Sequence, residues 1–189
     1  MTLALLKHRP CARPDPSGEP AQTSDTKPAF EHRAGGSRYR ITPRFRWDGA
    51  ARVVGNRPYH WGIAAALIPD DLALTWGPLV APPYAGQISY SQFSRFFFWR
   101  TSNLSLDRGT IVSNAANVHV IPADSRLRHA LRAISTGDDV RLEGWLVDID
   151  GVDDPSFHWA TSTVRDDEGP GSCETVYVTR LTVGERAYE

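Results

Sequence analysis

The sequence has little cysteine and no long apolar run. It holds 2 cysteines in 189 residues, Cys11 and Cys173, which lie far apart in the chain. This count excludes a four-cysteine zinc site and argues against a disulfide framework. No stretch approaches the roughly 18 consecutive apolar residues of a membrane-spanning helix, and the apolar start at Leu3–Leu6 is too short for a signal peptide. The chain as written is therefore expected to be cytoplasmic, without a membrane span.

An excess of charge of either sign is missing as well. The 21 Lys and Arg residues are balanced by 22 Asp and Glu residues, which gives a formal net charge of -1 at pH 7. Proteins that bind nucleic acids or anionic membranes usually carry a broad basic surface. Nucleic acid is therefore not the expected partner, and a protein or a small ligand is.

Proline and glycine are plentiful, with 14 and 15 residues, and they favour turns and short strands over long helices. The length suits one domain. Residues 1–36 are rich in Pro, Ser, Thr, Gly and charge, and have almost nothing to bury. Such a segment buries too little apolar surface to offset the conformational entropy that it would lose on ordering. We predict a disordered Pro-rich tail or linker at residues 1–36 and a single β-rich globular domain at residues 37–189.

Alternating apolar and polar residues predict strands in that domain. Ser37–Trp47 places its apolar residues on one side and its arginines on the other, and Pro43 fits only an edge or a break. Gly55–Pro58 is predicted as a turn. Further strands are predicted at Ala50–Val54, Ile88–Trp99, Thr110–Ile121 and Val140–Ile149. Two more strands, Phe157–Val164 and Cys173–Val183, are expected to form a hairpin. The apolar face of Val140–Ile149 changes at Gly144, which is typical of a bent strand.

One helix is predicted from Ser125 to about Ser135. Its apolar residues recur at i, i+3, i+4 and i+7, Asp124 or Ser125 can cap its start, and Gly137 can end it. The expected fold class is mainly β, with α+β as the alternative. We expect a small β-barrel or a curled antiparallel sheet with one short helix near residues 125–135.

Six stretches occur in a fixed order over most of residues 39–181: YRITPRFRWDGAARVV, DDLALTWGPL, ISYSQFSRFFFWR, SNAANVHVIPA, GDDVRLEGWLVDI and DEGPGSCETVYV. Together they resemble a family of uncharacterised bacterial proteins. The resemblance implies no activity, cofactor or catalytic residue. It does bear on location, because family members often carry a hydrophobic anchor before a Pro-rich linker, whereas this chain has the linker and the Leu3–Leu6 stub. Either the anchor was lost or the true start lies upstream, so a membrane-tethered or periplasmic location is the alternative.

A thiol site is the sharpest chemical candidate. Cys173 would be the nucleophile, His119 or His158 the base, and Asn117 the group that orients it. No nucleophile motif surrounds Cys173, and a cysteine at the start of a strand is typical of a buried structural residue.

The same histidines and Cys173, with nearby acids such as Asp148, Asp166 or Glu174, have the side chains of a metal site. No HxxxH, HxH or CxxC pair puts two ligands on one element, so neither a metal nor a cofactor is expected.

A polar run interrupts a segment that should be apolar. Asn114, Asn117 and His119 lie in it, where they serve a turn or buried hydrogen bonds or line a ligand pocket. Gln92 and Arg95, together with Arg100, are the expected polar companions across the sheet.

An arginine stripe with interleaved aromatic residues follows Ser37–Trp47, at Arg38, Arg40, Arg44 and Arg46. It resembles a surface for single-stranded nucleic acid. Strand alternation, however, puts the arginines and the aromatic residues on opposite faces, as in an ordinary solvated face over a buried one.

These observations leave the enzyme question open and favour a non-catalytic binding or structural module of a bacterial, envelope-associated protein. The first alternative is a Cys/His-dependent hydrolase or transferase that uses Cys173. The second is single-stranded nucleic-acid binding through the arginine and aromatic strand.

Overall fold

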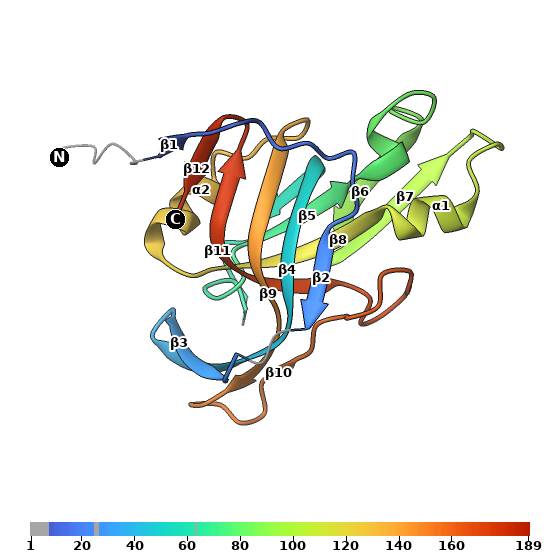
Figure 1. Ribbon diagram of the computed structural model, residues 1–189. Coiled ribbons are helices and arrows are strands. Elements are labelled where there is room, and N and C mark those ends of the chain that lie inside the picture. Colours follow the sequence, from blue (N-terminus) through green and yellow to red (C-terminus); the bar gives the residue numbers. More distant parts are fainter. Residues whose placement is uncertain (1–7, 25–26, 63) are drawn as a thin grey trace.

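The computed structural model describes residues 8–24, 27–62 and 64–189 and shows a mainly β protein (Figure 1). Strands account for 49% of residues and helices for 9%. Among the described residues, ten strands make one large curled sheet and two more make a separate hairpin. The mainly β fold class is therefore confirmed.

The strand β4 (Ser37–Pro58) is 22 residues long and organises the sheet. It pairs with β9 (Asp139–Gly151) along most of its length and with β5 (Asp70–Thr75) near its C-terminal end. Two register shifts interrupt these pairings, one between Pro43 and Phe45 and one between Val53 and Gly55. Such bulges bend a strand and increase its twist, which lets β4 follow the curl of the sheet.

The first bulge separates two parts of the core. Tyr39 and Ile41 belong to one buried cluster with Val147 and Ile149, whereas Trp47 belongs to another. Pro43 pairs with Val147, and Phe45 pairs with the adjacent residue of β9, Leu146. Arg44 therefore has no partner in β9 and is the extra residue of the bulge. The apolar side of β4 therefore faces opposite sides of the sheet before and after Arg44. Pro43 stands at this break, as the sequence predicts.

The curl of the sheet brings β8 (Ala115–Pro122) and β9 to either side of one strand, β11 (Glu174–Val183). This strand pairs with β8, the neighbour of β5, and also with β9. The sheet continues through β12 (Arg186–Tyr188) to β1 (Arg9–Pro10), and β10 (His158–Trp159) extends it from β9. It is a curled sheet and not a closed barrel. One pairing departs from the expected antiparallel sheet, because β8 and β11 run parallel.

Short strands occur in residues 8–24 and 27–36, the described part of the predicted disordered tail. β2 (Ala21–Ser24) and β3 (Phe30–Ala34) both pair with β4, and β1 pairs with β12. These short strands contribute few buried side chains. Their backbone groups are satisfied by the edges that β4 and β12 offer, and composition alone does not reveal such pairing. The Leu3–Leu6 stub lies outside the described residues.

The predicted helix is present as α2 (Ser125–Leu131), which ends before the expected residue 135. The carboxylate of Asp124 accepts the backbone N–H of Leu127 at 2.9 Å and caps the helix. Its apolar face lies in the core, where Leu127, Ala130 and Leu131 are buried. Within the described part of the chain, no helix has the length and apolar character needed to cross a membrane.

The predicted strand Thr110–Ile121 is wrong in its first part. Residues Arg108–Ser113 form the helix α1, in which the carboxylate of Asp107 accepts the N–H of Thr110 at 2.8 Å. This cap outweighs the strand preference of the β-branched residues that follow. A one-turn 3-10 helix, η1 (Gly77–Val80), precedes the hairpin.

The aromatic segment Ile88–Trp99 is a hairpin rather than one strand. β6 (Ile88–Phe93) and β7 (Phe96–Thr101) pair through a turn at Ser94 and Arg95, whose φ angles are +50° and +70°. Two positive φ angles match the twist of a two-residue hairpin turn, but this position usually holds Gly or Asn. The turn therefore has no strong sequence signal.

Two other expectations are wrong. The turn predicted at Gly55–Pro58 lies within β4, and the hairpin predicted from Phe157–Val164 and Cys173–Val183 does not form. β10 pairs instead with β9, and β11 pairs with β8 and β9.

Gly144 lies where β9 and β11 approach closely. A Cβ atom at this position would lie 1.9 Å from the backbone oxygen of Tyr177 and 3.1 Å from Cα of Val178. Because both neighbours belong to the backbone, no rotamer change relieves the overlap. Glycine is therefore needed here for close packing of two strands.

Gly144→Ala is expected to destabilise the fold by at least about 2 kcal/mol, because β9 and β11 must separate to admit the methyl group. Urea unfolding monitored by tryptophan fluorescence measures the change. Gly18→Ala is the matched control, since a Cβ atom there meets no heavy atom within 4 Å. Equal midpoints for the two variants would show that the strands tolerate the methyl group.

Candidate functional site

The candidate polar residues meet beneath the β6–β7 hairpin. In the sheet, Asp71 of β5 pairs with His119 of β8, and Ala73 pairs with Asn117. His119 also pairs with Thr175 of β11, so Cys173 lies beside Asn117. Because side chains alternate along strands, Asp71, Asn117 and His119 project from the same face. The hairpin covers this face and adds Gln92 from β6 and Arg95 from its turn.

Asp71 is the centre of the buried polar cluster. Its side chain is 1% exposed, and its Oδ1 accepts both Nη1 of Arg95 at 2.7 Å and Nδ1 of His119 at 2.8 Å. Its Oδ2 is buried with no hydrogen-bond partner among the described residues. Loss of Arg95 would leave this carboxylate without its permanent cation, at a high desolvation cost.

Arg95 fastens the hairpin turn to the body of the protein. Its backbone N–H donates to Oη of Tyr59 at 3.1 Å, and its guanidinium lies 3.5 Å from the centre of the Tyr59 ring. Nη2 donates to the carbonyl of Ile68 at 3.0 Å. The positive φ at Arg95 costs energy in a residue with a Cβ atom, and these contacts to Tyr59, Ile68 and Asp71 offset that cost.

Asn117 links the hairpin to Cys173. Nε2 of Gln92 donates to Oδ1 of Asn117 at 2.8 Å, and Nδ2 of Asn117 donates to the carbonyl of Arg95 at 3.2 Å. Nδ2 also contacts Sγ of Cys173 at 3.6 Å, and the thiol lies 3.7 Å from the Arg95 carbonyl that accepts from it. Burial raises the pKa of the Cys173 thiol to about 11. At neutral pH this thiol is protonated and acts as a hydrogen-bond donor.

His119, His158 and Cys173 line one cavity of about 350 Å³, termed the His119 pocket. The His119 ring meets the Trp159 ring edge-on, with 5.0 Å between their centres. His158 is largely exposed, and its Nδ1 lies 2.7 Å from Oδ1 of Asp150. The structure therefore brings the predicted thiol residues to one cavity, but the hydrogen bonds of Cys173 go to Asn117 and Arg95. Within the described ranges, no group of three or more His, Cys, Asp or Glu side chains could hold a metal.

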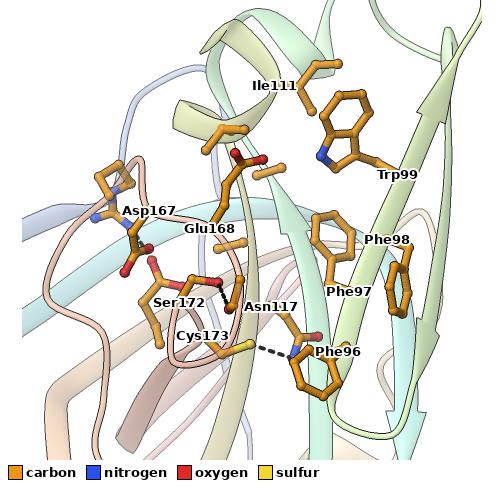
Figure 2. A pocket seen from close by; sticks show the side chains of 16 residues that line it. Phe96, Phe97, Phe98, Trp99, Ile111, Asn117, Asp167, Glu168, Ser172 and Cys173 are labelled. Carbon is orange, nitrogen blue, oxygen red and sulfur yellow. Dashed lines mark hydrogen bonds and ion pairs between the residues drawn. The ribbon is translucent and has the colours of Figure 1, made fainter. Parts of the chain in front are cut away.

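A second cavity of about 230 Å³, also lined by Cys173, lies between β7 and residues 165–174 and is termed the β7 pocket. Figure 2 shows Phe97 and Trp99 on the pocket side of β7, with Asp167 and Glu168 on the opposite wall. Asn117 and Cys173 lie at its base, joined by their hydrogen bond. One wall is aromatic and the other is acidic.

Behind the acidic wall, the buried Glu174 forms an ion pair with the partly buried Arg165. Oε1 of Glu174 lies 3.0 Å from Nη1 of Arg165, and Glu174 is 3% exposed. The Arg165 guanidinium lies over the rings of Trp47 and Trp76, at 4.5 and 5.2 Å from their centres. Burial raises the pKa of Glu174 to about 7, and the neighbouring Arg165 opposes this shift. Glu174 is thus a carboxyl group that changes charge near neutral pH.

Asn114 lies outside this network. It ends α1, and its Nδ2 donates to the carbonyl of Thr110 at 2.9 Å, which is the turn role that the sequence also allows. Four residues of the two pockets and of the hydrogen-bond network were not predicted from the sequence, because their partners are distant in the chain or depend on the folded loop. They are Tyr59, Asp71, Arg165 and Asp167.

Comparison with family models, curated proteins and solved structures gives no match to this chain. The assignment of a function therefore depends on the geometry of the two pockets.

Arg95→Ala is expected to destabilise the protein by about 3 kcal/mol, because it leaves the Asp71 carboxylate buried without its cation. Alanine keeps a Cβ atom at the same positive φ, so the change removes only side-chain contacts. Urea unfolding gives the stability, and hydrogen exchange of the β6–β7 amides reports detachment of the hairpin. Arg100→Ala, an exposed arginine of the same hairpin, is the control and should have little effect.

Adding Asp71→Asn to Arg95→Ala should restore part of the lost stability, since the buried charge is then gone. A loss in Arg95→Ala no larger than that in Arg100→Ala would refute a fastening role for Arg95.

Cys173 is expected to react slowly with iodoacetamide. In a Cys11→Ser variant, in which Cys173 is the remaining thiol, the folded protein should label roughly a hundredfold more slowly than glutathione near neutral pH. The rate should rise with pH towards the thiol pKa of about 11, because the thiolate is the reactive form. The same variant unfolded in urea should label at the glutathione rate. Fast labelling of the folded protein, with a midpoint below the usual thiol range, would contradict this.

Proposed function

We propose that this protein is a non-catalytic binding module that takes a small ligand into the β7 pocket. The observation that carries the proposal is the cavity itself, with an aromatic wall and a few polar groups at its base and opposite side. Small-molecule sites are typically concave and mainly apolar, with few polar groups that fix orientation. The envelope association implied by the family resemblance stays a prediction.

The size of the cavity supports a ligand of modest dimensions. An apolar cavity of about 150 Å³ can hold benzene, and a water molecule occupies about 30 Å³ of liquid. A cavity of about 230 Å³ therefore accommodates one ring with a short substituent.

The polar groups at the base support a binding role over catalysis. Asn117 and Cys173 bond to each other and to the Arg95 carbonyl, so their polar atoms hold the hairpin in place. A nucleophilic cysteine needs a thiolate, and the raised pKa of Cys173 opposes its formation.

The Cys/His enzyme remains the second candidate because of one observation. The carboxylate of Asp71 orients His119 through Nδ1, and Cys173 lines the same cavity as His119. An acid, a histidine and a thiol in that order are the parts of a nucleophilic site. The alkylation rate of Cys173 separates this candidate from the binding module.

The arginine stripe offers less support for nucleic-acid binding. Arg38 pairs with Asp153 at 2.8 Å, Arg44 with Asp148 at 3.6 Å, and Arg46 with Glu143 at 3.9 Å. Carboxylates thus neutralise three of the four arginines, which weakens the electrostatic attraction that a phosphate backbone requires.

The proposal predicts that filling the β7 pocket abolishes small-ligand binding. Ser172→Trp places an indole at a residue that lines the cavity, and a fragment screen by ligand-observed NMR compares it with the wild type. Ser156→Trp is the matched control, because Ser156 is also a turn serine but is exposed on another loop. Fragments should bind the wild type and Ser156→Trp and lose affinity for Ser172→Trp. Equal binding to all three proteins, or no fragment bound to the wild type, would refute the proposal.

A further inference from the structure

The two walls of the β7 pocket differ in chemistry. Phe97 and Trp99 present aromatic rings from β7, and each ring carries negative charge density on its face. The opposite wall and the back of the pocket hold three carboxyl groups, at Asp167, Glu168 and Glu174, and one guanidinium, at Arg165. Both walls therefore attract a cation.

Two of the three carboxyl groups already have a cationic partner. Glu174 is paired with Arg165, and Glu168 is paired with Arg108 of α1, whose Nε lies 3.0 Å from Oε2. Arg165 is fully engaged as well, since it also contacts Glu19 at 3.3 Å and the carbonyl of Pro20 at 3.3 Å. The guanidinium is therefore not free to neutralise another anion in the pocket.

Asp167 is the carboxylate with capacity left for a ligand. Its Oδ2 accepts the hydroxyl of Ser162 at 2.6 Å, which holds the side chain in place without neutralising it. In the described part of the chain, no Lys, Arg or His nitrogen pairs with Asp167 within 4.0 Å. Asp167 is thus an oriented anion on the wall opposite Phe97 and Trp99 (Figure 2).

We propose that the β7 pocket binds an organic ammonium ion that carries one ring or a short apolar chain. The apolar part packs against Phe97 and Trp99, and the ammonium group lies between the aromatic wall and the Asp167 carboxylate. Cations are attracted to aromatic faces, and a carboxylate hydrogen bond to an ammonium is about twice as strong as a neutral one. The size limit follows from the cavity of about 230 Å³. This inference rests on the proposed small-ligand function.

Glu174 adds to the attraction as the pH rises. Its carboxyl group changes charge near neutral pH, and it faces Arg165 and Asp167 around the same cavity. Ionised Glu174 neutralises Arg165, which would otherwise repel an incoming cation. The binding of a cation is therefore measured at a pH at which Glu174 is ionised.

Three probes of matched shape test the charge of the ligand: 2-phenylethylammonium, 2-phenylethanol and 3-phenylpropanoate. Isothermal titration at about pH 8, where a carboxyl of pKa near 7 is mostly ionised, should show the ammonium binding about tenfold or more tightly than the alcohol. The propanoate should bind least. Equal affinity for the alcohol or the propanoate would overturn the ammonium inference, while the small-ligand function would still stand.

Asp167→Asn identifies the carboxylate. The amide oxygen can still accept from Ser162, so the fold is preserved, and ammonium affinity should fall about tenfold while alcohol affinity stays the same. Asp166→Asn is the matched control, since its neighbour Asp166 is exposed and does not line the pocket. An equal loss in both variants, or none in Asp167→Asn, would overturn the assignment. Failure of all three probes on the wild type would also overturn it, and the fragment screen then decides the small-ligand function separately.

Discussion

The length of β4 constrains the rest of the structure. A strand of 22 residues that pairs with β9 and β5, and also with β2 and β3, cannot stay straight, because strands twist and each neighbour adds to that twist. The bulge at Arg44 absorbs the bend and passes the apolar side of β4 from one face of the sheet to the other. The sheet then curls far enough for β11 to pair with both β8 and β9. Gly144 permits that second pairing, since any side chain there would meet the backbone at Tyr177.

The meeting of β8 with β11 creates the site. Parallel pairing of these strands puts Asn117 beside Cys173, two residues that lie far apart in the sequence. The hairpin covers them, and Arg95 helps to hold it there by reaching the buried carboxylate of Asp71. Cys173 lines both cavities, the His119 pocket and the β7 pocket. The polar groups beneath the hairpin thus hold the aromatic strand at a fixed distance from residues 165–174.

Local patterns in the sequence were sufficient for some of these features. Alternation revealed the strand character of Ser37–Trp47, periodicity revealed α2, and polar residues in an apolar context revealed Asn117 and His119. Features that depend on distant pairing gave no such signal. Asp71 looks like an ordinary turn acid until the fold buries it between Arg95 and His119, and the β6–β7 turn lacks the Gly or Asn that marks most such turns. The helix before Asn114 was missed for the opposite reason, because its β-branched residues suggested a strand where Asp107 caps a helix.

The segment before residue 37 also contributes to the chemistry of the β7 pocket. Glu19 and the Pro20 carbonyl hold Arg165 from one side, while Trp47 and Trp76 hold its guanidinium from another. Arg165 in turn opposes the rise in the Glu174 pKa that burial causes. If Arg165 moved away, Glu174 would be protonated over a wider pH range and the acidic wall would lose charge. The charge of the pocket thus depends on a part of the chain whose composition resembles a linker but whose contacts belong to the domain.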